Sequence, residues 1–412
     1  MKDNKVAIWI GQKDLNHDPK FMEEAGNEFA RIPLEKMAES STLEQVGATR
    51  RDFLKYLGFG LGAATVAAAC EIPVRKAIPY VVKPDAIVPG VANYYASSFV
   101  KGGDYCAVLV KTREGRPIKI EGNDLSPVTM GGTSARAQAT VLELYDVNRI
   151  KGPGRIADGL VSDGSWAAID KEVIGALRPE SKIRILSNTL LSPALHAAIA
   201  EFSAAYPNTK LVQYDAVSSA AMLIANEQQF GMKTVPDYHF DGAKVIVGFE
   251  ADFLGTWISP IEYAKGYVKN RKIEHEEHAT MSRHYHVESH MSLTGSNADN
   301  RILVKPSEQG AAIAALYNEI AAQTGGTRVN APAGLNEKAT AAIKAAAKDL
   351  LANKGASLVV SGSNMVSEQL LVNQINLLLG NYGKTITFEH ASKQRQGDER
   401  DVARLIEEMQ GG

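Results

Sequence analysis

The stretch from Cys106 to Pro153 constrains the fold of this 412-residue chain more than any other. Apolar and polar residues alternate across 107–111 and again across 117–121, with Glu114-Gly115 between the two runs. This pattern predicts a β-hairpin, because alternation places every second side chain on one face of a strand and glycine permits a tight turn. A glycine pair then precedes a helical pattern across 135–145. The stretch therefore predicts a small unit of antiparallel strands and one helix.

Three motifs in this stretch carry a resemblance to a known family. They read "GRPIKIEG", "GGTSARAQA" and "LYDVNRIKGP". They resemble the N-terminal domain of the molybdopterin oxidoreductases, in which a hairpin ending in "GRxxKIEG" leads to "GGxxCxKGQA" and "LYDPxRxKGP". The resemblance implies an α/β fold, with a small β-rich N-terminal domain followed by doubly wound parallel-sheet domains. It also implies that four cysteines of this region once held an iron–sulfur cluster.

Those four cysteine positions are degenerate in this sequence. Aligned on the motifs, they fall on Phe99, Gly102, Cys106 and Ser134, and the only other cysteine in the chain is Cys70. Each iron of a cubane cluster needs a soft thiolate ligand, which phenylalanine, glycine and serine do not supply. The sequence therefore predicts a fold that was retained after its redox centre was lost, with no cofactor in this chain.

Composition sets broad limits on the function. A chain of 412 residues is expected to fold as two or three domains. The 45 Lys and Arg residues nearly balance the 47 Asp and Glu residues, so no strong field points to nucleic acid or to an acidic substrate. Two cysteines provide neither a disulfide framework nor a zinc framework.

The N-terminal part has the order of an export signal. A polar extension over 1–49 is followed by the twin arginines Arg50 and Arg51, and 56–69 is an apolar Gly/Ala-rich run that is short for a membrane span. The run ends in Ala-Ala-Ala-Cys70, which resembles a lipobox over the signal segment 50–70. If Cys70 is acylated, its lipid chains anchor the mature protein to the membrane. The alternative is an alanine-rich helix with a buried free cysteine.

The remainder of the chain predicts a β-rich domain over 71–153, α/β domains over 154–397 and a charged helix or tail over 398–412. Four prolines between 71 and 93 favour an extended arm at the start of the first of these. Helical and strand patterns alternate after 154, which indicates parallel sheets covered on both faces. Helices are expected at 165–177, 193–205 and 368–379, and strands at 183–186, 210–212, 244–247, 357–360 and 385–388, the last two forming a second α/β set.

Ligands of such sheets bind beyond the carboxyl ends of strands, which draws attention to two loops. One is 187–189, and the other is 248–253, where Glu250 replaces a small neutral residue of the family and would repel a pyrophosphate. The family's metal ligand would fall near Ser218 and Ser219. A serine hydroxyl can ligate molybdenum, but adjacent serines at a strand–helix junction are more typical of a helix cap.

Five histidines within 16 positions form a second candidate site: His275, His278, His284, His286 and His290. Histidine is the commonest metal ligand, so His284, His286 and His290 are metal candidates. They lack a helical His-x-x-x-His pair, and cationic neighbours would repel a metal ion. The favoured interpretation is a set of solvated or interfacial histidines.

Further motifs resemble the molybdopterin-like half of the B subunit of alternative complex III, over nearly the whole chain from Trp9 to Gly383. They are "ADFLGTW", "VESHMSLTGSNAD", "VKPSEQ" and "VSGSN". The resemblance implies a non-catalytic scaffold that docks redox subunits of a membrane-bound quinol-oxidising complex. It implies three partners: an iron–sulfur domain or subunit, a multihaem cytochrome c and integral membrane quinol-binding subunits. The chain ends without a CxxCxxC run, so iron–sulfur clusters and haem are expected in those partners.

This resemblance also implies a location at the periplasmic face of the cytoplasmic membrane. The alternative function is an active bis-pterin molybdenum oxidoreductase with serine ligation of the metal.

The order of the export signal generates a test of the anchor. We expect the mature protein from its native host to begin at acylated Cys70, because the twin arginines and the small residues precede it in the order that processing requires. Intact-mass measurement checks this expectation. A mature N-terminus elsewhere, or a Cys70→Ala protein that stays on the membrane without partners, would contradict a lipid tether.

Overall fold

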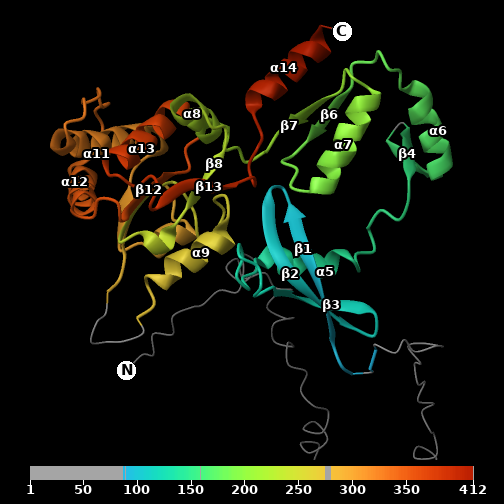
Figure 1. Cartoon of the computed structure of the whole chain (residues 1–412), viewed down its shortest axis with the longest axis horizontal. Coiled ribbons are helices and arrows are strands. Elements are labelled where there is room, and N and C mark those ends of the chain that lie inside the picture. The colour runs from blue at the N-terminus through green and yellow to red at the C-terminus, as the bar shows by residue number, and fades with distance from the viewer. Residues whose placement is uncertain (1–86, 89, 158, 274–279, 412) are drawn as a thin grey trace, which may run out of the picture. The chain divides into compact units, whose positions relative to one another are not determined.

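The structure is a computed structural model that describes residues 87–88, 90–157, 159–273 and 280–411 (Figure 1). The extension over 1–49, the arginines Arg50 and Arg51, the lipobox cysteine Cys70 and the two histidines His275 and His278 lie outside the described residues. Among the helices that are described, none has the length and apolar character needed to cross a membrane.

A three-stranded antiparallel sheet and one helix form the small β domain, 93–143. Its strands are β1 (Asn93–Lys101), β2 (Asp104–Arg113) and β3 (Arg116–Gly122), in the order β1-β2-β3. Helix α5 (Ala135–Glu143) packs against the sheet and closes an apolar core that includes Phe99, Cys106, Val108, Ile120 and Val141. The predicted hairpin and helix are confirmed, and β1 is an additional strand that the sequence did not indicate.

The hairpin turn has the geometry that its residues favour. Glu114 and Gly115 both have positive φ angles, 50° and 75°, as the two central residues of a type I′ turn require. Two residue pairs beyond the turn, the register shifts between the pairs Thr112–Pro117 and Lys111–Lys119. The shift leaves one extra residue on β3, which is a β-bulge and increases the local twist.

The next part of the chain, the 154–213 segment, contains two small sheets and two helices. Its elements are β4 (Gly154–Ala157), β5 (Leu160–Asp163), α6 (Trp166–Ala176), β6 (Arg184–Ser187), α7 (Pro193–Ala205) and β7 (Lys210–Gln213). Strands β4 and β5 pair antiparallel, and β6 and β7 pair parallel. Neither α6 nor α7 has a buried residue, and Leu186 of β6 is 59% exposed. The expectation of a sheet covered on both faces is therefore wrong for β6 and β7.

The main sheet has four parallel strands in the order β11-β10-β9-β12. They are β9 (Val245–Phe249), β10 (Arg283–Glu288), β11 (Asn300–Leu303) and β12 (Ser357–Ser361). Every residue of β9 and β12 is buried. Such continuous burial requires both faces of the sheet to be covered.

Helices cover the main sheet on both faces. Alternate side chains of β9 point to opposite sides, so Val247 joins one core cluster and Ile246 the other. The first cluster includes residues of α11 (Gln309–Thr324), α12 (Glu337–Ala352) and α13 (Val366–Leu378), and the second includes residues of α8 (Ala220–Phe230) and α9 (Pro260–Lys269). The predicted α/β fold with a doubly covered parallel sheet is confirmed for this part of the chain.

Two predicted strands pair differently from the expectation of a second α/β set. Strand β12 joins the main sheet beside β9, and β13 (Ile386–Ser392) pairs antiparallel with β8 (Val235–Tyr238). That expectation is wrong because an apolar run indicates a strand but not its neighbour. Three short helical elements complete this part of the fold: η2 (Phe240–Gly242), α10 (Leu293–Ser296) and η4 (Pro306–Glu308).

The charged C-terminal stretch is helical, as predicted. Helix α14 (Glu399–Gln410) begins after the N-cap Asp398, whose side chain accepts a hydrogen bond from Arg400 N at 3.0 Å. Glu408 of α14 forms an ion pair with Arg184 of β6 at 2.6 Å. The helix therefore packs on the 154–213 segment instead of forming a free tail.

A glycine at the end of β3 generates a test of the small β domain. A Cβ added at Gly122 would lie 1.9 Å from the carbonyl oxygen of Gly131, so the turn before α5 must move. We expect Gly122→Ala to destabilise this domain by about 1–3 kcal/mol. Hydrogen exchange of the β2 and β3 amides should then accelerate about tenfold or more. Gly175→Ala in α6 meets no atom within 4 Å and serves as the control, with unchanged exchange in β2 and β3.

Candidate functional site

The fold brings together the four positions at which the sequence predicts lost cluster ligands. Phe99 and Cys106 are register partners in β1 and β2, and Gly102 lies in the turn between these strands. Ser134 is the N-cap of α5, where its hydroxyl accepts a hydrogen bond from Ala137 N at 3.1 Å. Phe99, Gly102 and Ser134 line one cavity of about 250 Å³. Three of the four positions therefore line one cavity, and Cys106 lies beside Phe99 on the neighbouring strand.

The single remaining thiol is poorly suited to ligate iron. Cys106 is fully buried, and its Sγ donates to the carbonyl oxygen of Gly132 at 3.2 Å. Burial raises the pKa of the Cys106 thiol, and a backbone hydrogen bond from Ser134 opposes that shift only in part. A cluster ligand must be a thiolate, so both the number and the protonation state of thiols disagree with a cluster. The residues present do not fit this group.

Ion pairs occupy the rim of the same cavity. Arg136 forms an ion pair with Asp104 at the start of β2. Arg395 donates from Nη2 to the other oxygen of Asp104 at 3.0 Å and from Nη1 to Gln394 O at 2.9 Å. Arg395 is only 6% exposed, so its charge depends on Asp104 for compensation. The cationic side chains of this cavity are therefore committed to internal contacts.

A second cavity lies at the carboxyl end of the main sheet. The chain runs from β9 to β10 on one side, whereas β12 lies on the other side of β9, so the strand order reverses between β9 and β12. The crevice at such a reversal is where open α/β sheets bind ligands. Here it holds about 130 Å³ and is lined by Ser218, Ser219, Glu250, Asp252, Ser361, Gly362, Ser363 and Arg395, among others. We call it the switch-point crevice.

Both carboxylates of the switch-point crevice hold neighbouring loops. Glu250 Oε1 accepts from Ser289 N at 2.6 Å and from Gln309 Nε2 at 2.9 Å. Asp252 Oδ1 accepts from the backbone and the hydroxyl of Thr294 at 3.0 and 2.8 Å. Each carboxylate therefore stabilises the loop that follows β10. Glu250, which the sequence predicts would repel a pyrophosphate, lines the crevice, and Asp252 adds a second carboxylate there.

Ser218 and Ser219, which the sequence offered as metal ligands or as a helix cap, lie at the start of α8. Ser219 is the N-cap residue of α8, yet its side chain makes no capping hydrogen bond. The hydroxyl of Ser218 accepts from Ala220 N at 3.0 Å, and Asn364 Oδ1 accepts from Ala221 N at 3.1 Å. The start of α8 is therefore satisfied by Ser218 and Asn364. Both serines line the switch-point crevice beside two carboxylates.

The size and charge of this crevice disfavour a large anionic cofactor. Pockets for drug-sized ligands hold about 300 Å³ or more, against about 130 Å³ here. Its two carboxylates face a single arginine, Arg395, that is already paired with Asp104. A pyrophosphate group would meet net negative charge. The residues of this crevice do not fit a pterin dinucleotide.

The histidine expectation is wrong for two of the three described members. His284 and His286 are fully buried on β10, whereas the side chain of His290 is 75% exposed. The Tyr267 hydroxyl donates to Asn297 O at 3.0 Å, so His284 Nδ1, 3.2 Å from the same hydroxyl, is the donor of that contact. His284 Nε2 and both ring nitrogens of His286 have no hydrogen-bond partner among the described residues. The polarity of the segment suggested solvent, but β10 is an interior strand of the main sheet.

A buried charge network adjoins these histidines. Glu288 has no exposed side-chain surface, and it forms an ion pair with Arg301 and accepts from the Ser292 hydroxyl at 2.6 Å. Burial raises the pKa of Glu288, but the bonds from Arg301 and Ser292 together lower it below its ordinary value. His286 Nε2 lies 3.5 Å from Glu288 Oε2. Nevertheless, within the described part of the chain no three His, Cys, Asp or Glu residues are grouped so as to hold a metal ion.

Sequence reasoning missed two residues that line these cavities, Asp104 and Arg395. It also missed Asp215, which lies outside both linings and whose carboxylate accepts from Thr189 N at 2.8 Å and Gly397 N at 3.0 Å. Asp104 and Arg395 are 291 positions apart. No local motif marks such a pair.

Comparisons with known proteins leave the family open. No protein-family description matches the chain, and no curated protein matches it. Among solved structures it is similar to acetylene hydratase from Pelobacter acetylenicus, with 11% sequence identity and a TM-score of 0.38. The similarity covers 68% of this chain and 37% of that chain, so this chain spans little more than a third of that protein's length. A likeness of this extent identifies neither a family nor an activity.

The buried histidines generate a test by pH. Burial lowers the pKa of His284 to about 3 from an ordinary value of 6.5, so the unfolded chain binds this proton more readily than the folded one. The contribution of neutral His284 to the free energy of unfolding is therefore fully present above pH 6.5. It is lost as the pH falls from 6.5 toward 3, by about 1.4 kcal/mol per pH unit. Urea unfolding at pH 7 to pH 4 measures this loss.

We expect the free energy of unfolding of His284→Gln to fall less steeply with decreasing pH than that of the unmodified chain. The difference in slope should correspond to about one proton bound on unfolding. His290→Gln is the control, because its side chain is exposed, and its curve should follow the unmodified protein. Identical slopes for His284→Gln and the unmodified chain would show that His284 is protonated in the folded state.

Proposed function

We propose that this chain is a non-catalytic scaffold domain of a membrane-bound quinol:electron-acceptor oxidoreductase of the alternative complex III type. In this role it docks redox subunits and carries no redox group itself. The observation that carries the proposal is the convergence of Phe99, Gly102 and Ser134 around one cavity, with Cys106 buried beside Phe99. Three of these four positions provide no sulfur ligand, which supports a chain that carries no cluster.

The switch-point crevice supports the same proposal against the enzyme alternative. A bis-pterin molybdenum centre ligated by Ser218 or Ser219 would require space and positive charge at the carboxyl end of β9. The crevice holds about 130 Å³, and its anions Glu250 and Asp252 are fixed by hydrogen bonds to the loop after β10. Enlarging the crevice would break these hydrogen bonds, and this cost argues against the enzyme alternative.

The proposed partners and location follow from the motifs of the sequence. An iron–sulfur domain or subunit, a multihaem cytochrome c and integral membrane quinol-binding subunits would carry the electrons. Export through Arg50-Arg51 and a lipid on Cys70 would hold the chain at the periplasmic face of the cytoplasmic membrane. Exposed apolar side chains such as Trp166 and Ile174 of α6, 68% and 66% exposed, support a chain that functions in contact with other subunits.

Restoring or removing thiols tests the scaffold function. We expect Ser134→Cys to leave the iron content of the domain unchanged, because Phe99 and Gly102 still provide no thiolate. Cys106→Ala should leave quinol oxidation per assembled complex unchanged and cost about 1 kcal/mol of stability through lost packing. Metal analysis and activity of the complex purified from its native host are the measurements.

Two results would overturn the scaffold function in favour of the enzyme. One is stoichiometric molybdenum in this domain. The other is activity per complex that collapses in Cys106→Ala while assembly stays normal. A loss of assembly in Cys106→Ala would be assigned to packing, which a melting curve of the isolated chain measures separately.

A further inference from the structure

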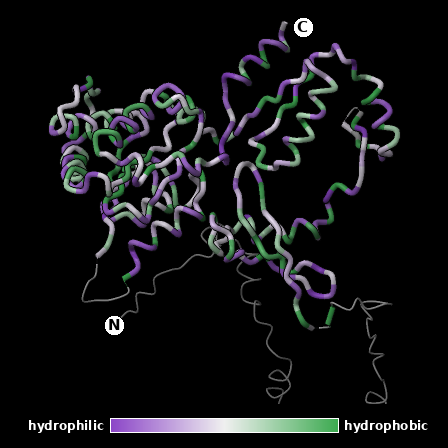
Figure 2. The backbone as a smooth tube through the Cα atoms, in the orientation of Figure 1, coloured by the Kyte–Doolittle hydropathy of each residue, from purple (hydrophilic) through white to green (hydrophobic). Residues whose placement is uncertain are grey.

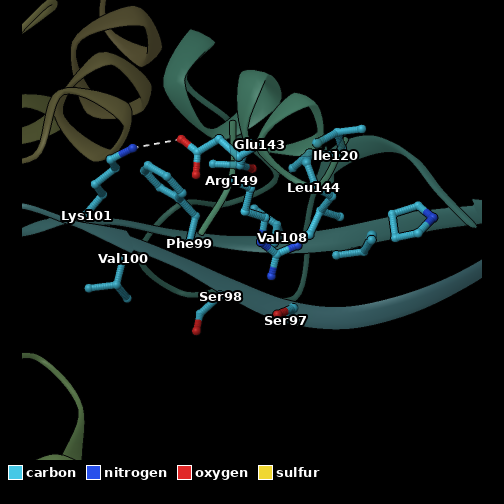
Figure 3. A pocket seen from close by; sticks show the side chains of 14 residues that line it. Ser97, Ser98, Phe99, Val100, Lys101, Val108, Ile120, Glu143, Leu144 and Arg149 are labelled. Carbon is cyan, nitrogen blue, oxygen red and sulfur yellow. Dashed lines mark hydrogen bonds and ion pairs between the residues drawn. The ribbon is translucent and has the colours of Figure 1, made fainter. Parts of the chain in front are cut away.

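We infer that a groove of the small β domain receives an extended, acidic peptide segment of a partner subunit, which adds to strand β1 as a fourth strand. The inference rests on the proposed scaffold function and names one of its docking surfaces. Figure 3 shows the groove, which holds about 420 Å³ between β1 and α5. Five successive residues of β1, from Ser97 to Lys101, line it, a length of about 13 Å at ~3.3 Å per residue.

The edge of β1 is open to strand addition. Among the described residues the sheet has the order β1-β2-β3, so β1 pairs on one side only. Its pairing with β2 is regular from Asn93 to Lys101, without a bulge. No proline or charged residue interrupts it from Tyr94 to Val100, although edge strands are usually protected by such residues. A long, regular and unprotected edge is a template for another strand.

The groove beside this edge has an apolar floor. Val108, Ile120 and Val141 form it and belong to the domain core. Val100 and Leu144 are 47% and 46% exposed at its margins, so an apolar side chain of an added strand would find apolar neighbours. The exposed hydroxyls of Ser97 and Ser98 add hydrogen-bonding groups along β1.

The charges of the groove select an acidic occupant. At one end Lys101 Nζ and Glu143 Oε1 form an ion pair at 2.7 Å and neutralise each other (Figure 3). The remaining charged lining residue is Arg149, whose guanidinium makes no hydrogen bond or ion pair with a described residue. Among its described lining residues the groove therefore has one uncompensated positive charge, which a carboxylate of the occupant would complement. A nucleic acid is disfavoured, because a polyanion would meet only one free cation in this described lining.

Two other occupants are less compatible with the groove. The chain's own arm over 71–86 contains Pro73, Pro79 and Pro84, and proline cannot donate to a strand ladder. A second copy would pair β1 with β1 and bring no acidic residue from the edge itself, because Tyr94–Val100 contains none. A partner segment with a carboxylate flanked by apolar residues can form backbone hydrogen bonds along the edge of β1 and an ion pair with Arg149.

Charge reversal at Arg149 tests the inference in the full chain, purified with its partners from the native host. We expect Arg149→Glu to lower the amount of one co-purifying subunit about tenfold, measured by quantitative mass spectrometry. Arg328→Glu is the matched control, because Arg328 is also exposed and unpaired among the described residues but lies outside the groove. It should retain every subunit, and both variants should melt like the unmodified chain.

A photo-crosslinker identifies the occupant. With p-benzoylphenylalanine in place of Ser98, we expect a cross-link to a segment of that same subunit containing Asp or Glu. The same group in place of Ser162, an exposed residue of β5, should give no such product. Reversing the acid of the cross-linked segment to Lys should restore binding to Arg149→Glu.

The outcomes test the groove inference and the scaffold function separately. If partners co-purify but Arg149→Glu retains all of them, the groove inference is wrong and the scaffold function stands. A cross-link to residues 71–86 or to a second copy of the chain likewise overturns the inference. If the unmodified chain co-purifies with no redox subunit, the scaffold function fails, and the inference fails with it.

Discussion

The ion pair between the buried Arg395 and the half-buried Asp104 links the C-terminal part of the chain to the small β domain, across 291 sequence positions. Removing Asp104 would leave the Arg395 charge buried without compensation, at a cost of about 3–5 kcal/mol, whereas Asp104 is 28% exposed and also pairs with Arg136. The residues beside Arg395 extend the same junction. Gln394 Nε2 donates to Ser259 Oγ at 3.1 Å, and Gln396 N donates to Thr189 Oγ1 at 2.7 Å. One short segment thus bonds to the small β domain, to the loop after β6 and to the start of α9.

This junction also connects two cavities of the chain. Arg395 lines both the cavity at Phe99, Gly102 and Ser134 and the switch-point crevice. Here a structural ion pair lies between them, and Glu250 and Asp252 fix the loops of the crevice. The polar residues of both cavities are therefore engaged in contacts that stabilise the chain.

Local features were predictable from the sequence because local interactions determine them. Helix α7 has the bounds expected, since Ser192 caps it and a proline occupies its first turn. The convergence of Phe99, Gly102 and Ser134 was predictable from motif spacing. The pairing of β13 and the contact between Asp104 and Arg395 were not, because no periodicity specifies which distant segments meet. The burial of the β10 histidines was missed for the same reason, since a polar sequence became an interior strand.

The distribution of apolar surface separates two parts of the chain. The main sheet buries every residue of β9 and β12, which are mostly apolar. Strands β10 and β11 also carry hydrophilic residues, so both colours of Figure 2 occur in this part of the chain. The 154–213 segment has no buried residue in either helix, and Trp166 and Ile174 remain in contact with solvent. Burial of apolar area is the main favourable term in folding. The segment therefore has less of its own stabilisation than the main sheet, and a partner that covers α6 would contribute stability as well as affinity, because binding to the folded form alone shifts the folding equilibrium.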